Sequence, residues 1–162
     1  MARPGVSDFI RECLARYDVA IYSSTTWHNI KPLLDEILPE ELLSQLKFVW
    51  TRDHTRLDPS YGQEGYHYLR PFDTVKDLHY VFDNPAINVE RCYDLSNTLI
   101  VDNEERKVRL NPEENCMIWE EYVPDNTEKD RETLNNMFNL IGARFEALEL
   151  THADWWLEDG HI

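Results

Sequence analysis

The sequence predicts an α/β fold in which a mainly parallel sheet carries helices on both faces. Two observations lead to this prediction. Short apolar runs alternate with amphipathic helical patterns, and the runs are apolar at successive positions, as in strands buried on both faces. Alternating helices and strands typically form a parallel sheet. With 162 residues, of which 42% are hydrophobic, the chain is expected to form one domain over residues 3–150.

Apolar residues spaced three and four positions apart predict the helices. They are expected over residues 6–17, 27–38, 39–46, 75–82 and 128–148. Pro39 suits the start of the third helix, because the first turn does not use the N–H that proline lacks. The Trp-rich acidic tail of residues 151–162, with Trp155 and Trp156, is expected either to pack on the domain or to form a contact surface.

Four short apolar runs predict the strands, over residues 19–22 (VAIY), 47–50 (KFVW), 97–103 (NTLIVDN) and 116–119 (CMIW). The stretch from Thr51 to Arg70 is rich in Tyr, Gly and Asp and lacks periodicity. A loop of this length typically has a functional role. Ligands of a parallel sheet bind beyond the carboxyl ends of its strands, so the residues that follow these runs are candidates for a site.

Charge and cysteine content exclude several classes of protein. Asp and Glu outnumber Lys and Arg by 31 to 16, and the net charge of −15 repels nucleic acid and anionic lipid. Three distant cysteines, Cys13, Cys92 and Cys116, indicate neither a disulfide framework nor a zinc site. No apolar run approaches the ~20 residues that span a bilayer, and no secretion signal is recognised. We expect an intracellular protein, nuclear or cytoplasmic, with no nucleic-acid or membrane partner.

Hydroxyl side chains follow the first predicted strand at Ser23, Ser24 and Thr25. Hydroxyls and free backbone N–H groups at a strand-to-helix turn can bind an anion, because the helix dipole favours negative charge there. A phosphate group is the expected ligand. The same residues could instead form an ordinary helix cap, and both interpretations stay open.

Two oxygen-bearing side chains, Asp102 and Asn103, follow the third predicted strand and offer the ligands that Mg²⁺ prefers. Lys76 or Arg52 could neutralise phosphoryl oxygens during a transfer reaction. Together with the hydroxyl residues, these side chains suggest a magnesium-assisted phosphoryl-transfer site. An ordinary turn at residues 102–103 and a solvated surface charge at Lys76 are the alternatives.

The chain resembles a known phosphatase family in four blocks, which occur in the order RPGVSDFIRECLARYDVAIYSSTTWHNIKPLLDEIL, FVWTRDHT, TVKDL and NTLIVDNEERKVRLNPEENCMIW. This family is the phosphatase domain shared by RNA polymerase II C-terminal-domain phosphatases and nuclear LIM-interactor-interacting-factor-like proteins, within the haloacid dehalogenase (HAD) superfamily. The resemblance covers residues 3–121. It implies a HAD-like fold and a Mg²⁺-dependent phosphatase that forms an aspartyl phosphate and acts on phosphoserine or phosphothreonine in a phosphoprotein or peptide.

The resemblance also implies roles for individual residues. Ser23 would bind the transferring phosphate, and Lys76 would stabilise it. Asp102 and Asn103 would take part in Mg²⁺ binding, and Arg52 would lie on the substrate side of the site.

One segment of the family pattern is missing. Family members begin with an apolar strand ending in D-x-D-x-T, whose first Asp is the nucleophile and whose second is the general acid; this sequence starts after that segment and contains no other such motif. We expect the chain by itself to be inactive, with weak Mg²⁺ binding or none, because no phospho-aspartate forms without the nucleophile. The missing strand would lie mid-sheet, between the strands that end at Ser23 and Asp102. Its absence predicts either a directly closed gap or a sheet completed by a second copy or a partner strand.

Two alternative functions stay open at this point. A pseudophosphatase would use the same fold as a protein-interaction module, which fits the absent nucleophile and the Trp-rich tail. The chain is also similar, in IYSST and NPEENCMIWEEY, to the import-receptor subunit of the mitochondrial inner-membrane translocase, which would imply a mitochondrial location. Neither a transmembrane segment nor a presequence supports that branch.

Overall fold

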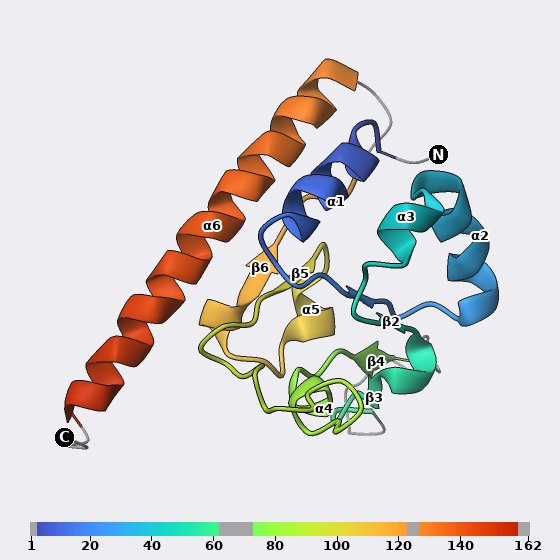
Figure 1. Cartoon of the computed structure of the whole chain (residues 1–162). Helices are drawn as coiled ribbons and strands as arrows, with labels where there is room; N and C mark the ends of the chain where they lie inside the picture. The colour runs from blue at the N-terminus through green and yellow to red at the C-terminus, as the bar shows by residue number, and fades with distance from the viewer. Residues whose placement is uncertain (1–2, 62–72, 123–126, 159–162) are drawn as a thin grey trace.

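The structure, a computed structural model, describes residues 3–61, 73–122 and 127–158, and within the last helix it describes the side chains of residues 132–149 (Figure 1). The helices are α1 (Val6–Leu14), α2 (Trp27–Ile37), α3 (Glu40–Leu43), α4 (His79–Phe82), α5 (Glu105–Val108) and α6 (Thr127–Glu158), with short 3-10 helices η1 (Arg52–His54) and η2 (Glu113–Asn115). The strands are β1 (Ile21–Tyr22), β2 (Val49–Trp50), β3 (Arg56–Leu57), β4 (Thr74–Val75), β5 (Ile100–Asp102) and β6 (Cys116–Ile118).

The strands of the described residues form three separate pairs. β1 pairs with β2 and β5 pairs with β6, both in parallel, whereas β3 and β4 form an antiparallel ribbon. The mixed helix and strand composition and the parallel pairing agree with the predicted α/β class. The single continuous sheet that the sequence suggested is replaced by three two-stranded sheets, because β1 and β5 lie on opposite sides of a cavity and do not hydrogen-bond to each other.

Helices cover both faces of the parallel strands. On one face, α6 runs beside α1 and β6 (Figure 1), and Ile141 of α6 shares an apolar cluster with Met117 of β6. On the other face, Leu78 and Val108 form a cluster with Ile100 of β5. Successive strand residues point to opposite faces, so a strand between two helical layers needs apolar side chains at consecutive positions.

The helices α2 and α3 pack on the β1–β2 pair. Ile21 of β1 and Val49 of β2 contact a third apolar cluster. Its buried members are Ile30, Leu34, Leu38 and Leu42. The three- and four-residue spacing of this set places its side chains on one face, which explains why the two helices stay against these strands.

Hydrophobic spacing located most elements correctly. α1, α2, α3, β1, β2, β5 and β6 all lie inside the ranges expected for them. The helix expected over residues 75–82 is wrong in its first part, because Val75 pairs in β4 and the helix begins at His79. η1 and β3 occupy part of the loop expected over residues 51–70, of which residues 62–70 lie outside the described residues.

The last helix is longer than its apolar pattern suggested. α6 continues to Glu158, so the first residues of the expected tail are helical. The side chains of Trp155 and Trp156, and residues 159–162, lie outside the described residues. Within the described ranges, no helix combines the length and the apolar character needed to cross a membrane.

Candidate functional site

A buried ion pair between Lys76 and Asp102 lies at the carboxyl end of β5. Asp102 is the last residue of this strand, and its carbonyl accepts a hydrogen bond from the N–H of Trp119 at 2.8 Å. One carboxylate oxygen of Asp102 accepts a hydrogen bond from the N–H of Glu104 at 2.9 Å, and the other contacts the Lys76 ammonium. The Lys76 and Asp102 side chains are 11% and 4% exposed, so both charges are largely removed from water.

Contacts with the α5 region hold Lys76 in place. Lys76 directly follows β4, and its N–H donates to the carbonyl of Lys107 at 2.7 Å. The side-chain amide of Asn111 donates to the Lys76 carbonyl at 2.8 Å, while its oxygen accepts a hydrogen bond from the N–H of Leu78 at 2.8 Å. Asn111 therefore fixes both ends of the short turn that carries the lysine.

Further ion pairs attach the segment before Lys76 to the same helix region. The buried Asp73 contacts Arg106 and also Lys107, the latter at 3.3 Å, and the buried Asp58 contacts Arg109. Each acid lies near the β3–β4 ribbon, and each base lies in or directly after α5. Sequence analysis missed these residues, because the partners are more than 30 positions apart and no local spacing links them.

The hydroxyl residues after β1 form a second group with Arg52. The N–H of Ser23 donates to the carbonyl of Trp50 at 2.8 Å, and the Ser23 hydroxyl accepts a hydrogen bond from the N–H of Thr25 at 3.2 Å. The N–H of Arg52 donates to the carbonyl of Thr25 at 2.8 Å. The Nε of Arg52 donates to the carbonyl of Ser24 at 3.0 Å. The group is therefore a turn tied to the residues that follow β2.

The hydroxyls of this second group do not act as a helix cap in the structure. Thr26 is the N-cap of α2, and its side chain makes no capping hydrogen bond. The Ser24 hydroxyl is buried, and the described residues offer it no hydrogen-bond partner. Among the described contacts, no hydrogen bond or ion pair joins Ser23 to Lys76. No direct contact thus links the two groups of predicted site residues, and their joint role in phosphate binding stays a prediction.

The donors at the end of β5 do not by themselves fit Mg²⁺. Lys76, Asp102 and Asn103 line a common hollow of about 400 Å³, in which Asn103 is exposed. Both carboxylate oxygens of Asp102 already have partners. Over the parts of the chain that the structure describes, no group of three His, Cys, Asp or Glu side chains could hold a metal ion. Mg²⁺ binding needs one or two available carboxylates and usually a substrate phosphate, so donors beyond this set are required.

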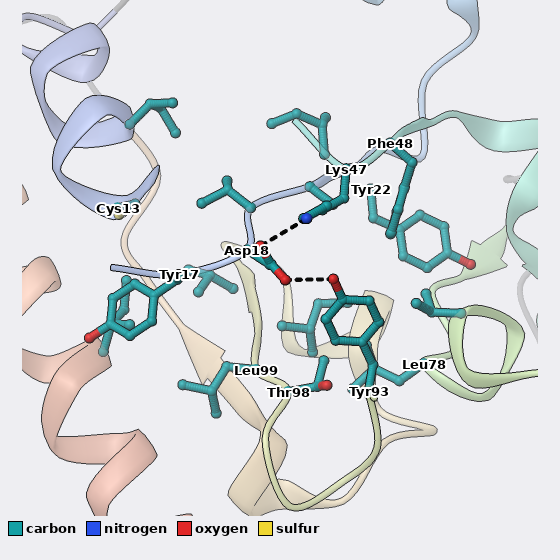
Figure 2. Close-up of a pocket in the computed structure, with 18 of the residues that line it drawn as sticks. Cys13, Tyr17, Asp18, Tyr22, Lys47, Phe48, Leu78, Tyr93, Thr98 and Leu99 are labelled. Atoms are coloured by element: carbon teal, nitrogen blue, oxygen red, sulfur yellow. Dashed lines mark hydrogen bonds and ion pairs between the residues drawn. The ribbon is translucent and has the colours of Figure 1, made fainter. Parts of the chain in front are cut away.

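A second hollow, of about 380 Å³, lies between residues 19–22 around β1 and residues 98–101 around β5, and we call it the central cavity. Figure 2 shows a group of three polar side chains among those that line it. The Tyr93 hydroxyl donates to Asp18 at 2.6 Å, and the Lys47 ammonium lies 3.1 Å from the same carboxylate. The remaining walls are mainly apolar side chains of α1, the α4 region and α6.

The titratable groups of the central cavity are not prepared for catalysis. The hydrogen bond from Tyr93 holds the pKa of Asp18 below its usual value, and the same bond raises the pKa of the Tyr93 phenol. Burial, together with the charge of Glu12, raises the pKa of the Cys13 thiol to about 11. Neither the phenol nor the thiol ionises at neutral pH, so neither is an activated nucleophile.

Comparison with known proteins identifies the family. A profile of the NLI interacting factor-like phosphatases matches residues 1–147. The chain belongs to this family. One relative, an uncharacterised FCP1 homology domain-containing protein of Schizosaccharomyces pombe, is 27% identical over 111 residues, which are 68% of this chain and 44% of that protein. The chain therefore spans less than half the length of this relative.

Proposed function

We propose that the chain is the C-terminal part of a HAD-like, Mg²⁺-dependent protein serine/threonine phosphatase domain. The observation that carries this proposal is the buried Lys76–Asp102 pair at the carboxyl end of a parallel strand, in a chain that belongs to a phosphatase family. This is the end of a parallel sheet at which ligands typically bind. Lys76 would neutralise a phosphate, and the carboxylate and amide of residues 102 and 103 would contribute to a metal site once further donors are present.

The 162-residue chain should not hydrolyse phosphate esters by itself. It contains no D-x-D-x-T motif, so no carboxylate is placed to form a phospho-aspartate. In addition, the Lys76 charge is already balanced by Asp102. A magnesium ion, when bound, would balance phosphate charge and orient the ester, but the oxygen donors that the described residues place at the end of β5 are too few to hold it.

Two measurements test this proposal on the chain as it exists. In the first, hydrolysis of p-nitrophenyl phosphate is followed with and without Mg²⁺, and no turnover above background is expected. Mg²⁺-dependent turnover that disappears in Asp102→Asn would overturn the claim of inactivity. In the second, orthophosphate binding is followed by calorimetric titration for the wild type, Lys76→Met and Lys31→Met.

Lys31 is the matched control, because it is a half-exposed lysine of α2 that is paired with Asp35 on the helix surface. Loss of Lys76 should weaken orthophosphate binding at least about five-fold, whereas loss of Lys31 should leave it unchanged. Equal affinity in all three proteins would remove Lys76 from the proposed phosphate site. Circular dichroism of each variant separates a loss of binding from a loss of folding.

The second candidate function is a pseudophosphatase that serves as a protein-interaction module. The specific observation in its favour is that Lys76 and Asp102 satisfy each other inside the protein, which leaves neither side chain free for a phosphate or a metal. This candidate predicts no orthophosphate binding by the wild-type chain at millimolar concentration. The calorimetric titration therefore distinguishes the two functions.

A further inference from the structure

The Tyr22 hydroxyl lies between the two groups of predicted site residues. Tyr22 is the last residue of β1 and directly precedes Ser23. Its hydroxyl donates a hydrogen bond to the carbonyl of His54 at 2.7 Å. His54 is the last residue of η1, which begins at Arg52, so this bond ties the end of β1 to the turn that carries the arginine.

The same hydroxyl also contacts the turn that carries Lys76. The N–H of Asp77, the residue after Lys76, donates a hydrogen bond to the phenol oxygen. The Tyr22 ring packs against the apolar cluster that contains Leu78. Tyr22 therefore contacts both the backbone and the apolar side of this turn, although it belongs to β1.

The protonation state of Tyr22 suits a bridge between these two turns. Burial raises the pKa of the phenol to about 12, and the hydrogen bond from Asp77 lowers the pKa by less than burial raises it. The phenol therefore keeps its proton at neutral pH, donates it to the His54 carbonyl and accepts from Asp77. A phenylalanine at this position could do neither.

The His54 end of the bridge is held by its own contacts. The imidazole of His54 stacks on the buried indole of Trp50 in β2, with ring centroids 5.1 Å apart and an interplanar angle of 6°. The Nδ1 atom of His54 accepts a hydrogen bond from the N–H of Thr51 at 3.2 Å. These contacts fix the single turn of η1, so Arg52 and the carbonyl that Tyr22 binds form one unit.

The Asp77 end of the bridge is held in a similar way. The Asp77 side chain is 6% exposed, and its carboxylate lies 3.2 Å from the Arg56 guanidinium. The same carboxylate accepts a hydrogen bond from the N–H of His79 at 3.0 Å. The β3–β4 ribbon joins η1 to this turn, and Tyr22 adds the link to β1 and to Ser23 at its end.

We propose that Tyr22 is a positioning residue of the phosphate site, whose hydroxyl sets the distance between the Ser23–Arg52 group and Lys76 so that one phosphate contacts both. This inference rests on the proposed function, because it assigns Tyr22 a role in phosphate binding. Tyr22 acts through the backbone at His54 and Asp77 and is assigned no contact with the phosphate. The spacing matters because charge-assisted hydrogen bonds are short, so two groups bind one phosphate only when both are correctly placed.

Calorimetric titration with orthophosphate at neutral pH tests this role in the wild type, Tyr22→Phe and Tyr93→Phe. Tyr93 is the matched control, because its hydroxyl also donates a hydrogen bond, to Asp18 at 2.6 Å, but before β1 rather than at its carboxyl end. Tyr22→Phe should weaken orthophosphate binding at least about three-fold, and Tyr93→Phe by less than about 1.5-fold. Circular dichroism checks the folding of each variant.

A positioning role also predicts that the effect of Tyr22→Phe depends on Lys76. In a Lys76→Met background, the additional change Tyr22→Phe should weaken orthophosphate binding by less than about 1.5-fold, because no lysine remains to be positioned. A general loss of structure would instead weaken binding by the same factor in both backgrounds.

Hydrogen exchange provides two further measurements. Without phosphate, the Asp77 amide should exchange at least about three-fold faster in Tyr22→Phe than in the wild type, because it loses its acceptor, and at an unchanged rate in Tyr93→Phe. In the wild type, added orthophosphate should slow exchange at the amides of Arg52 and Lys76 together, a result that needs no variant.

The outcomes separate this inference from the proposed function. If the wild type binds no orthophosphate, the proposed function is overturned and the role of Tyr22 falls with it. Binding that is weakened by Lys76→Met but not by Tyr22→Phe would overturn the positioning role alone. Equal effects of Tyr22→Phe with and without Lys76, an unchanged exchange rate at the Asp77 amide, or protection by phosphate of only one of the Arg52 and Lys76 amides would also overturn it.

Discussion

The ion pair between Lys76 and Asp102 offers the sharpest test of the structure. Changing Asp102 to Asn removes the negative charge and keeps an oxygen that can accept the hydrogen bond from the N–H of Glu104. Changing Lys76 to Met removes the positive charge and keeps most of the apolar stem. Each variant leaves one charge in a site where the side chains are only 11% and 4% exposed.

The expected loss of stability follows from this burial. Removing one partner of a buried ion pair costs about 3–5 kcal/mol, because the remaining charge is neither hydrated nor balanced. The small residual exposure of Lys76 places the expected value near the lower limit, at about 3 kcal/mol. For a chain of this size, that loss lowers the melting temperature by about 6–12 °C. The double variant should be more stable than the sum of the two losses predicts, with a coupling energy of about 2 kcal/mol.

Urea unfolding followed by circular dichroism measures these differences, provided that all four proteins show the same dependence on urea. The matched control is the pair of Lys31 and Asp35 in α2, where both side chains are 48% exposed. The same substitutions at this exposed pair should cost only about 0.3–0.5 kcal/mol. Losses below about 1 kcal/mol at Lys76 and Asp102, with no coupling between them, would refute the argument that they form a buried pair.

Two further predictions concern the loops around the central cavity. Asn115→Ala should destabilise the protein by about 1–3 kcal/mol in urea unfolding. The Asn115 side chain is fully buried and donates to the carbonyls of Leu95 and Thr98, at 2.7 and 2.8 Å, and these carbonyls would lose their donor. An effect no larger than that of an exposed Asn→Ala change would contradict this prediction. Tyr93→Phe should destabilise the protein near neutral pH but progressively less below about pH 4. The Tyr93 hydrogen bond lowers the pKa of Asp18, so its stabilisation is present while Asp18 is ionised in both states and is lost as the pH falls through the lowered pKa. A loss of stability in Tyr93→Phe that is independent of pH would show that this hydrogen bond does not act through Asp18.

Hydrophobic spacing was sufficient to locate the long helices and the main strands. α2 was predictable because its apolar residues recur at three and four positions, and β1 because its run is apolar at consecutive positions. β4 and α5 were not predictable in this way. Val75 is fully buried by long-range contacts, and α5 has one turn with a single buried residue, Val108, which is too short for a periodic signal.

The same division applies to the candidate site. The sequence placed Ser23 and Asp102 at the ends of strands, because an apolar run followed by polar residues marks such an end. Lys76 was singled out as a cation and by family resemblance, but its contact with Asp102, 26 residues away, depends on the path of the chain. Asn111, which fixes the turn that carries Lys76, had no local signal for this role, because the two backbone groups that it binds in that turn lie more than 30 residues earlier.

The sequence by itself determined the α/β class, the family and the residue types available at the strand ends, because these depend on local spacing and on motifs. Only the tertiary structure decided that Lys76 and Asp102 neutralise each other, that Arg52 is hydrogen-bonded to the turn after β1, and that β1 and β5 border an apolar cavity. The physical reason is that local sequence encodes which face of an element is buried. Which elements meet depends on contacts between distant segments, and these form only when the whole chain folds.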